Sequence, residues 1–328
     1  MISDPFLMYT LTDIKEVDRM MQLPNSVHSH LREPKGSVST LMEQWSIEVT
    51  PRTAAKIDDF RAILPKGTRV YIAHIGGTPI EDMVMTARRI HEQGFPVMPH
   101  FPARSIPNAA TLEDWIFRYR EEADVKQALL LGGNNAKPDG AFESAIQLME
   151  TGLFDRHGFN RLHIAGHPEG SRDIDKQGGT TNVDSALASK QDFASRTDAE
   201  MAIVTQFAFE ASAVTNWAER IRDMGVTIPV HVGIAGPAKL KTLIQYAATC
   251  GVGASLQVLK KRAFDVTRLL MPYEPTDVVR DLLEYKSKNP DSLLEQLHVF
   301  PLGGIPAAVE WMKQHSAENE RQRAGSLR

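Results

Sequence analysis

The chain has little of what marks secreted and membrane proteins. Its single cysteine, Cys250, excludes an internal disulfide and fits a reducing compartment. No apolar run approaches the roughly 18 residues that a membrane helix needs. The first residues lack the basic region and continuous apolar stretch of a signal peptide. We therefore expect a cytoplasmic protein with no membrane partner.

An excess of charge of one sign is also absent. The formal net charge is -4, from 37 Lys and Arg against 41 Asp and Glu, and the two signs are interspersed. This balance gives no electrostatic reason to expect a nucleic-acid partner. With 328 residues, of which 42% are hydrophobic, the chain has ample material for one large core. The sequence leaves open whether the chain forms a homo-oligomer.

Short apolar segments alternate with stretches of helical periodicity. The eight segments are residues 46–49, 69–74, 96–101, 125–131, 161–165, 201–207, 228–233 and 297–302. Strands that alternate with helices form a parallel sheet, and eight such units close into a barrel. We predict an α/β protein with a single (β/α)8 TIM barrel over residues 45–315. Residues 1–44 are predicted to be a short N-terminal extension with one helix, and residues 316–328 a frayed polar tail.

Residues that can do chemistry follow most of these segments. They are Glu48, His74, His100, Asn134, Glu169 and Gln206. The active site of a (β/α)8 barrel collects at the C-terminal ends of its strands. The pattern therefore predicts an enzyme, with Glu48, His100, Asn134, His167 and Gln206 on one rim of the barrel.

The histidines also raise the question of a metal site. Metal-dependent barrel hydrolases build their sites from His, Asp and Glu, and this chain offers His74, His100, His163, His167, Glu48 and Glu169. The chain has neither an HxH nor an HExxH spacing, so we predict no metal site. A metal-dependent hydrolase or lyase stays as a less favoured alternative, and Glu48 as a simple ion-pair partner of Arg52 is another.

Two loops stand out by composition. Gly132 and Gly133 lack a Cβ and can bring backbone close to a ligand, although an ordinary turn has the same signature. Residues 170–184 are polar and long enough for a mobile lid, with a solvated loop as the alternative.

Five motifs, in order along the chain, resemble the methylenetetrahydrofolate reductase family. Residues 46–52 (Ser-Ile-Glu-Val-Thr-Pro-Arg) resemble the family's opening strand, and residues 164–170 (Ile-Ala-Gly-His-Pro-Glu-Gly) its Tyr-Pro-Glu stretch. Residues 203–209 (Ile-Val-Thr-Gln-Phe-Ala-Phe) give the most specific match. Residues 233–237 and 298–303 stand where the family has its last two motifs. The resemblance covers residues 45–312.

The resemblance implies an activity in one-carbon metabolism that feeds methionine biosynthesis. NADH or NADPH would reduce 5,10-methylenetetrahydrofolate to 5-methyltetrahydrofolate through FAD. Glu48 would be the acid that protonates N10 of the folate, and burial would keep its carboxyl group protonated near pH 7. Gln206 would bind the pterin edge or the nicotinamide amide. Tyr246 and Leu302 would sandwich the flat ring, with plain core packing as the alternative for both.

The sequence departs from the family where the flavin is expected to bind. Gly132, Gly133 and Asn134 replace an Arg-Gly-Asp sequence, His167 replaces a tyrosine, and Arg196 aligns with a lysine. Ala73 and Ser171 replace two further polar residues of the family. The implied FAD contacts are His100, Gly132, Gly133, Asn134, His167 and Arg196. A flavin-independent enzyme, or one that acts on another one-carbon pterin, is the alternative.

Overall fold

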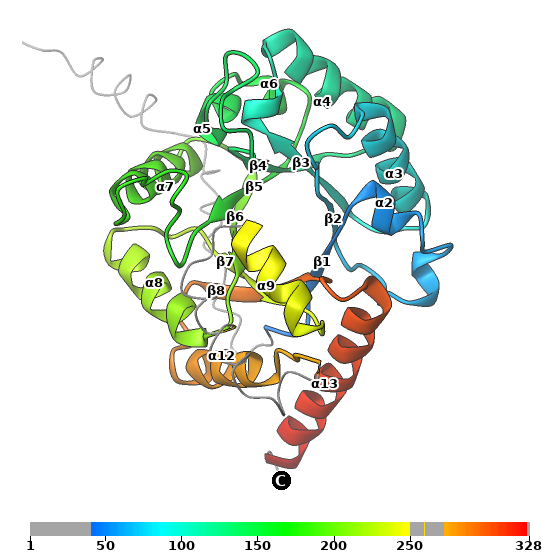
Figure 1. Ribbon diagram of the computed structural model, residues 1–328, viewed down its shortest axis with the longest axis vertical. Coiled ribbons are helices and arrows are strands. Elements are labelled where there is room, and N and C mark those ends of the chain that lie inside the picture. The colour runs from blue at the N-terminus through cyan, green and yellow to red at the C-terminus, as the bar shows by residue number, and fades with distance from the viewer. Residues whose placement is uncertain (1–40, 250–258, 260–271, 327–328) are drawn as a thin grey trace, which may run out of the picture. The chain divides into compact units, whose positions relative to one another are not determined.

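Eight parallel strands form a closed barrel in chain order (Figure 1). The structure is a computed structural model that describes residues 41–249, 259 and 272–326. The strands are β1 Ser46–Val49, β2 Val70–Ile72, β3 Val97–Pro102, β4 Gln127–Leu131, β5 Arg161–Gly166, β6 Glu200–Phe207, β7 Val230–Ala235 and β8 Leu294–Phe300. This topology confirms the predicted (β/α)8 barrel.

Helices connect consecutive strands and surround the barrel (Figure 1). They are α2 Pro51–Ala54, α3 Ile80–Glu92, α4 Ala109–Ala123, α5 Ala145–Met149, α6 Leu153–Arg156, α7 Thr181–Ala194, α8 Ala211–Asp223, α9 Leu240–Thr249, α12 Thr276–Lys288 and α13 Ile305–Ser326, with 3-10 turns η1 Phe60–Ala62 and η2 Ala103–Ser105. No helix among these described residues is long and apolar enough to cross a membrane.

Some element boundaries differ from the predicted ones. The helix predicted after β1 is broken into α2 and η1, because Asp59 caps a new turn with its side chain. The last helix, predicted to end at residue 315, continues to Ser326. The predicted helix of the N-terminal extension, and Cys250, lie outside the described residues.

Strand residues alternate between two environments, as the pleat requires. On β1, Ile47 and Val49 belong to the large apolar core that packs strands against helices. Ser46 and Glu48 point the other way, into the barrel. The interior holds a small apolar group of Tyr71, Met98, Leu129 and Val204. It also holds three buried histidines on β5, β7 and β8, namely His163, His231 and His298. Branched apolar residues usually fill this space, so the barrel axis is unusually polar.

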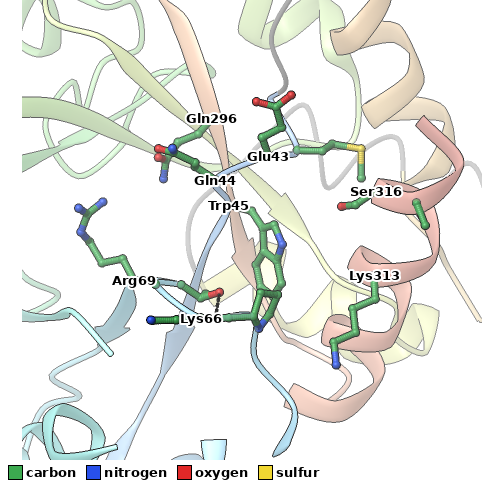
Figure 2. Close-up of a pocket in the computed structure, with 13 residues that line it drawn as sticks. Glu43, Gln44, Trp45, Lys66, Arg69, Gln296, Lys313 and Ser316 are labelled. Carbon is green, nitrogen blue, oxygen red and sulfur yellow. Dashed lines mark hydrogen bonds between the residues drawn. The ribbon is translucent and has the colours of Figure 1, made fainter. Parts of the chain in front are cut away.

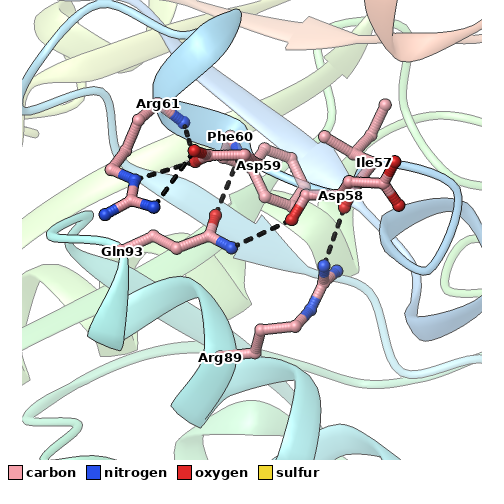
Figure 3. A network of polar contacts seen from close by, with 7 residues as sticks. All are labelled: Ile57, Asp58, Asp59, Phe60, Arg61, Arg89 and Gln93. Carbon is pink, nitrogen blue, oxygen red and sulfur yellow. Dashed lines mark hydrogen bonds and ion pairs between the residues drawn. The ribbon is translucent and has the colours of Figure 1, made fainter.

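The connection that follows β1 is fixed to α3 by a polar network (Figure 3). The Arg89 guanidinium donates to the carbonyls of Ile57 (2.7 Å) and Ala54 (2.6 Å). The Gln93 side chain accepts from the amide of Phe60 at 2.9 Å. These bonds satisfy backbone groups of an irregular segment. They also hold α2 in place just after Glu48.

Candidate active site

A large cavity lies at the C-terminal end of the barrel, and we call it the mouth cavity. Its volume is about 1190 Å³. Residues from β1, α2, the β2–α3 loop, α9 and the end of β8 line it, among them Glu48, Arg52, Lys56, Tyr246, Phe300 and Leu302. Asn134, from the loop after β4, also lines it. Four of the predicted site residues, Glu48, Asn134, Tyr246 and Leu302, are thus brought to one cavity.

Glu48 lies between two histidines from neighbouring parts of the barrel. Its Oε2 atom is 3.3 Å from Nε2 of His100 on β3 and 3.8 Å from Nε2 of His298 on β8. The Glu48 side chain is 20% exposed, whereas those of His100 and His298 are 11% and 0% exposed. None of the described residues bonds to the other oxygen, Oε1. The carboxylate therefore has one oxygen beside two imidazole nitrogens, neither of which has a hydrogen-bond partner among the described residues, and one oxygen left for a ligand.

The electrostatics of Glu48 differ from what the sequence predicts. Burial alone raises the pKa of Glu48, but the charge and contacts of His100, then those of His298, lower it to about 2. The expectation that burial keeps this carboxyl group protonated is therefore wrong for this arrangement. Burial lowers the pKa of His298, which keeps that ring neutral despite its contact with Glu48. Glu48 is therefore a carboxylate near neutral pH, and two imidazole rings flank it.

Further polar contacts lie deeper in the barrel. The Tyr71 hydroxyl is 2.6 Å from Nδ1 of His163. His231 contacts Glu295 at 3.1 Å. Burial lowers the pKa of both His163 and His231. These interior rings are neutral and form part of the packed core.

The opposite side of the mouth, above β3 to β5, is filled by an arginine. Arg104, in η2, donates to the carbonyls of Asn135 (2.9 Å) and Glu143 (3.3 Å) and pairs with Asp173 at 2.5 Å. A Cβ added at Gly132 would lie 3.5 Å from the Arg104 guanidinium. Gly133 has φ +91°, and a Cβ there would lie 3.0 Å from the Pro102 side chain. Gly133 is thus required by its positive φ and by the close Pro102 side chain, whereas a Cβ at Gly132 would make only an ordinary contact with Arg104.

His167 follows β5, and its surroundings include a lysine that sequence reasoning missed. Burial, reinforced by the nearby Lys190, lowers the pKa of His167 to about 4. Burial likewise lowers the pKa of Lys190, on α7, to about 8. No acidic side chain in the described part of the chain forms an ion pair with Lys190. The helical spacing contains a signal for this lysine, because Lys190 is three residues from buried Leu187 and from buried Phe193.

Arg196 does not lie on the rim, so its predicted role as a flavin ligand is wrong. It follows α7 and precedes β6, which places it at the N-terminal end of the barrel. There it contacts Glu150 at 3.6 Å and stacks on the ring of Phe193. The reason is topological, since a residue between a helix and the next strand lies at the end opposite to the active site.

The remaining predicted residues are at the C-terminal ends of their strands. Gln206 is near the end of β6 but is not among the residues that line the mouth cavity. His74 stacks on Trp115 and contacts the carbonyl of Thr78 at 3.0 Å, so it is held in a structural role. Within the described ranges, no group of three or more His, Cys, Asp or Glu is arranged to hold a metal ion.

Comparison with known proteins finds only distant similarities. No family model matches the chain. A 7,8-dihydropteroate synthase from Vibrio fischeri ES114 is 11% identical, with a TM-score of 0.42 over 87% of this chain and 96% of that one. A mutant tryptophan synthase alpha-subunit from Pyrococcus furiosus is 12% identical, with a TM-score of 0.39 over 74% and 96%. A monomeric dihydrodipicolinate synthase variant is 11% identical, with a TM-score of 0.35 over 76% and 80%. These similarities are too distant to indicate what the chain binds.

Proposed function

We propose that this chain is an NAD(P)H-dependent reductase that converts 5,10-methylenetetrahydrofolate to 5-methyltetrahydrofolate in the mouth cavity. The observation that carries the proposal is the position of Glu48. Its carboxylate lines a cavity of about 1190 Å³, with no described residue bonded to one oxygen and two histidine nitrogens 3.3 and 3.8 Å from the other. The five sequence motifs that resemble the methylenetetrahydrofolate reductase family support the same substrate.

The walls of the cavity suit a flat ring with an anionic tail. Ile75, Met85 and Tyr246 line the cavity and are 53%, 61% and 44% exposed, which leaves apolar surface for an aromatic ligand. Arg52 and Lys56 lie on the same side, and neither pairs with an acidic side chain among the described residues. Carboxylates are the natural partners of such cations. A folate carries both a flat pterin and a carboxylate tail.

The Glu48–His100 pair would supply the proton of the reaction. Protonation of N10 breaks the bond between N10 and the bridging carbon, and the electrons of N5 form an N5 iminium. Hydride from NAD(P)H then adds to the exocyclic carbon and gives the methyl group, with NAD(P)+ as the second product. Since the low pKa of Glu48 leaves its carboxyl group ionised, a proton must reach Glu48 before it passes to N10, and we propose that His100, 3.3 Å away, delivers it.

The residues predicted to bind FAD do not fit the flavin as a set. Gly132 and Gly133 pack against Arg104 and Pro102, and Arg196 lies at the other end of the barrel. Of the predicted contacts, only Asn134 lines the mouth cavity. These observations favour direct hydride transfer from NAD(P)H. The FAD-dependent reductase is the second candidate, with Lys190 beside His167 as a cation that the sequence comparison overlooked.

The test is to purify the protein without denaturation, record its visible spectrum and assay it with methylenetetrahydrofolate. We expect oxidation of NADH or NADPH that depends on the folate, with 5-methyltetrahydrofolate identified by mass spectrometry. A colourless protein that is active without added FAD supports direct transfer, and a yellow one supports the flavin route. No folate-dependent oxidation of either nucleotide, with FAD present or absent, would contradict the proposed function.

A further inference from the structure

A chain of polar side chains leads from Glu48 into the barrel. Ser46 and His298 are register partners on β1 and β8. The Ser46 hydroxyl oxygen is 2.9 Å from Nδ1 of His298 and accepts a hydrogen bond from Nε2 of Gln296 at 3.3 Å. On its other side, the Nε2 atom of His298 lies 3.8 Å from Glu48 Oε2, which is longer than a hydrogen bond, and it has no hydrogen-bond partner among the described residues. Ser46, Gln296 and His298 are all buried, so partners within the protein decide the hydrogen bonds of Ser46 and of Nδ1 of His298.

These partners select one tautomer of His298. Gln296 uses a lone pair of the Ser46 oxygen, and the hydroxyl proton then needs an acceptor. The unprotonated Nδ1 of His298 is the acceptor at hand. If Nδ1 carried the proton, the Ser46 hydroxyl would lose this acceptor and would be left with the oxygen of Tyr71, which already contacts Nδ1 of His163 at 2.6 Å. The neutral ring therefore carries its proton on Nε2, which faces Glu48.

We propose that His298 is a positioning residue whose tautomer, set by Ser46 and Gln296, directs an N–H at Glu48 Oε2 and so turns Oε1 toward the cavity. The contact between Oε1 and a folate rests on the proposed function, but the tautomer of His298 does not depend on that function. The groups facing Glu48 from the packed strands are His100 on β3 and His298 on β8, with Tyr71 of β2 edge-on against His298 at 4.5 Å between ring centroids.

The far end of this polar chain lies in a second cavity, at the N-terminal end of the barrel (Figure 2). This cavity has a volume of about 580 Å³ and is lined by Gln296 together with Trp45, Lys66, Arg69 and Lys313. Gln296 is not among the residues that line the mouth cavity. A substitution at Gln296 can therefore act on Ser46 and His298 without changing the lining of the mouth cavity.

The decisive variant is Gln296→Glu, which has nearly the same shape and reverses the hydrogen bonds. A carboxylate only accepts, and Arg69 in the same cavity favours its ionised form. The Ser46 hydroxyl would then donate to the new carboxylate and accept from Nδ1–H of His298. The lone pair of Nε2 would face Glu48 Oε2, and the midpoint of Glu48 protonation should rise by about one pH unit or more. Gln296→Met is the matched control, because it removes the donor without reversing the chain.

Nuclear magnetic resonance of the ligand-free protein gives both readouts. The nitrogen resonances of His298, assigned by their loss in His298→Asn, show which ring nitrogen carries the proton. The carboxyl carbon resonance that disappears in Glu48→Gln reports the ionisation of Glu48. We expect the proton on Nε2 in the unmodified protein and on Nδ1 in Gln296→Glu, with the higher midpoint of Glu48 in that variant alone.

Two results would overturn the proposal. A proton on Nδ1 of His298 in the unmodified protein near neutral pH would do so without any variant. An equal shift of Glu48 in Gln296→Glu and Gln296→Met would show that packing, and not the tautomer, acts on Glu48. Neither result depends on reductase activity, so failure of the proposed function is detected separately by the folate assay.

Discussion

The two sides of the barrel mouth differ in what occupies the space above the strands. Above β1, β2 and β8 there is an open cavity with Glu48 at its floor. Above β3 to β5, the Arg104 guanidinium occupies the space beside the glycine loop and pairs with Asp173. A pair of glycines at a strand end is thus evidence for close approach, but it does not say whether a ligand or the protein itself approaches.

The largest expected effect is that of Glu48→Gln on the open side. This change keeps the shape but removes the group that protonates N10, so methylenetetrahydrofolate reduction should fall by about 10²–10⁴-fold. Steady-state assays measure this loss, and if the protein holds a flavin, stopped-flow should show its reduction by NAD(P)H at a near-normal rate.

Asp173→Asn is the matched control for Glu48→Gln on the closed side. It is also a carboxylate-to-amide change, and Asp173 pairs only with Arg104 among the described residues. Its activity should stay within about tenfold of the unmodified protein, because one ion pair with an exposed partner contributes little. Equal losses in the two variants would mean that the two sides of the mouth do not differ in function.

Arg104→Ala tests whether the closed side is structural. It removes two bonds to backbone carbonyls and one ion pair from a side chain that is only 15% exposed. We expect a loss of roughly 2–3 kcal/mol in the free energy of unfolding, measured by denaturant titration. Arg88→Ala is the control, since Arg88 forms an exposed pair with Glu92 and should cost less than about 0.5 kcal/mol. A large rise in KM without loss of stability would instead identify Arg104 as a ligand-binding residue.

The sequence predicts the barrel and the rim positions well, because both follow from the order of local segments. Glu48 and His100 each lie near the end of an apolar run, and parallel strands bring such ends together. The environment of Glu48 was not predictable in the same way. It depends first on His100 and then on His298, whose partner Ser46 is 252 positions away in the chain. Long-range contacts of this kind leave no local pattern, so the sign of the Glu48 pKa shift was missed.

The error at Arg196 has a different origin. Arg196 is close to β6 in the sequence, but it precedes the strand and therefore lies at the N-terminal end of the barrel. Helix periodicity indicates Lys190 as a cation near the site, because Lys190 shares the inward face of α7 with Leu187 and Phe193. A cation on an otherwise buried helix face is a signal that sequence analysis can use.

The two cations of the open side should affect folate binding more than turnover. The double variant Arg52→Ala and Lys56→Ala removes both positive charges from the cavity wall. We expect KM for methylenetetrahydrofolate to rise by about tenfold with kcat nearly unchanged. This result is typical of an interaction that stabilises the bound substrate and the transition state equally. Lys66→Ala with Lys313→Ala, in the cavity at the other end, is the control and should leave KM unchanged. A fall in kcat without a change in KM would place the folate tail elsewhere.

The smallest expected effect is the contribution of His167, on the closed side, to the pH dependence of the protein's free energy of unfolding. Its pKa is lowered from 6.5 to about 4, first by burial and then by Lys190. Between these two values the unfolded chain binds more protons than the folded protein, so stability falls as the pH falls from 6.5 toward 4. His163, His231 and His298 add to the slope in the same direction, because burial lowers each pKa.

His167→Asn should therefore remove only part of the slope, about 1 kcal/mol across this range after solvent screening. Urea titrations of both proteins at several pH values measure the difference. Lys190→Met should have a smaller effect of the same sign, because it relieves only the repulsion and leaves the burial. Parallel stability curves for the unmodified protein and His167→Asn would show that His167 takes up its proton as easily in the folded protein as in the unfolded chain.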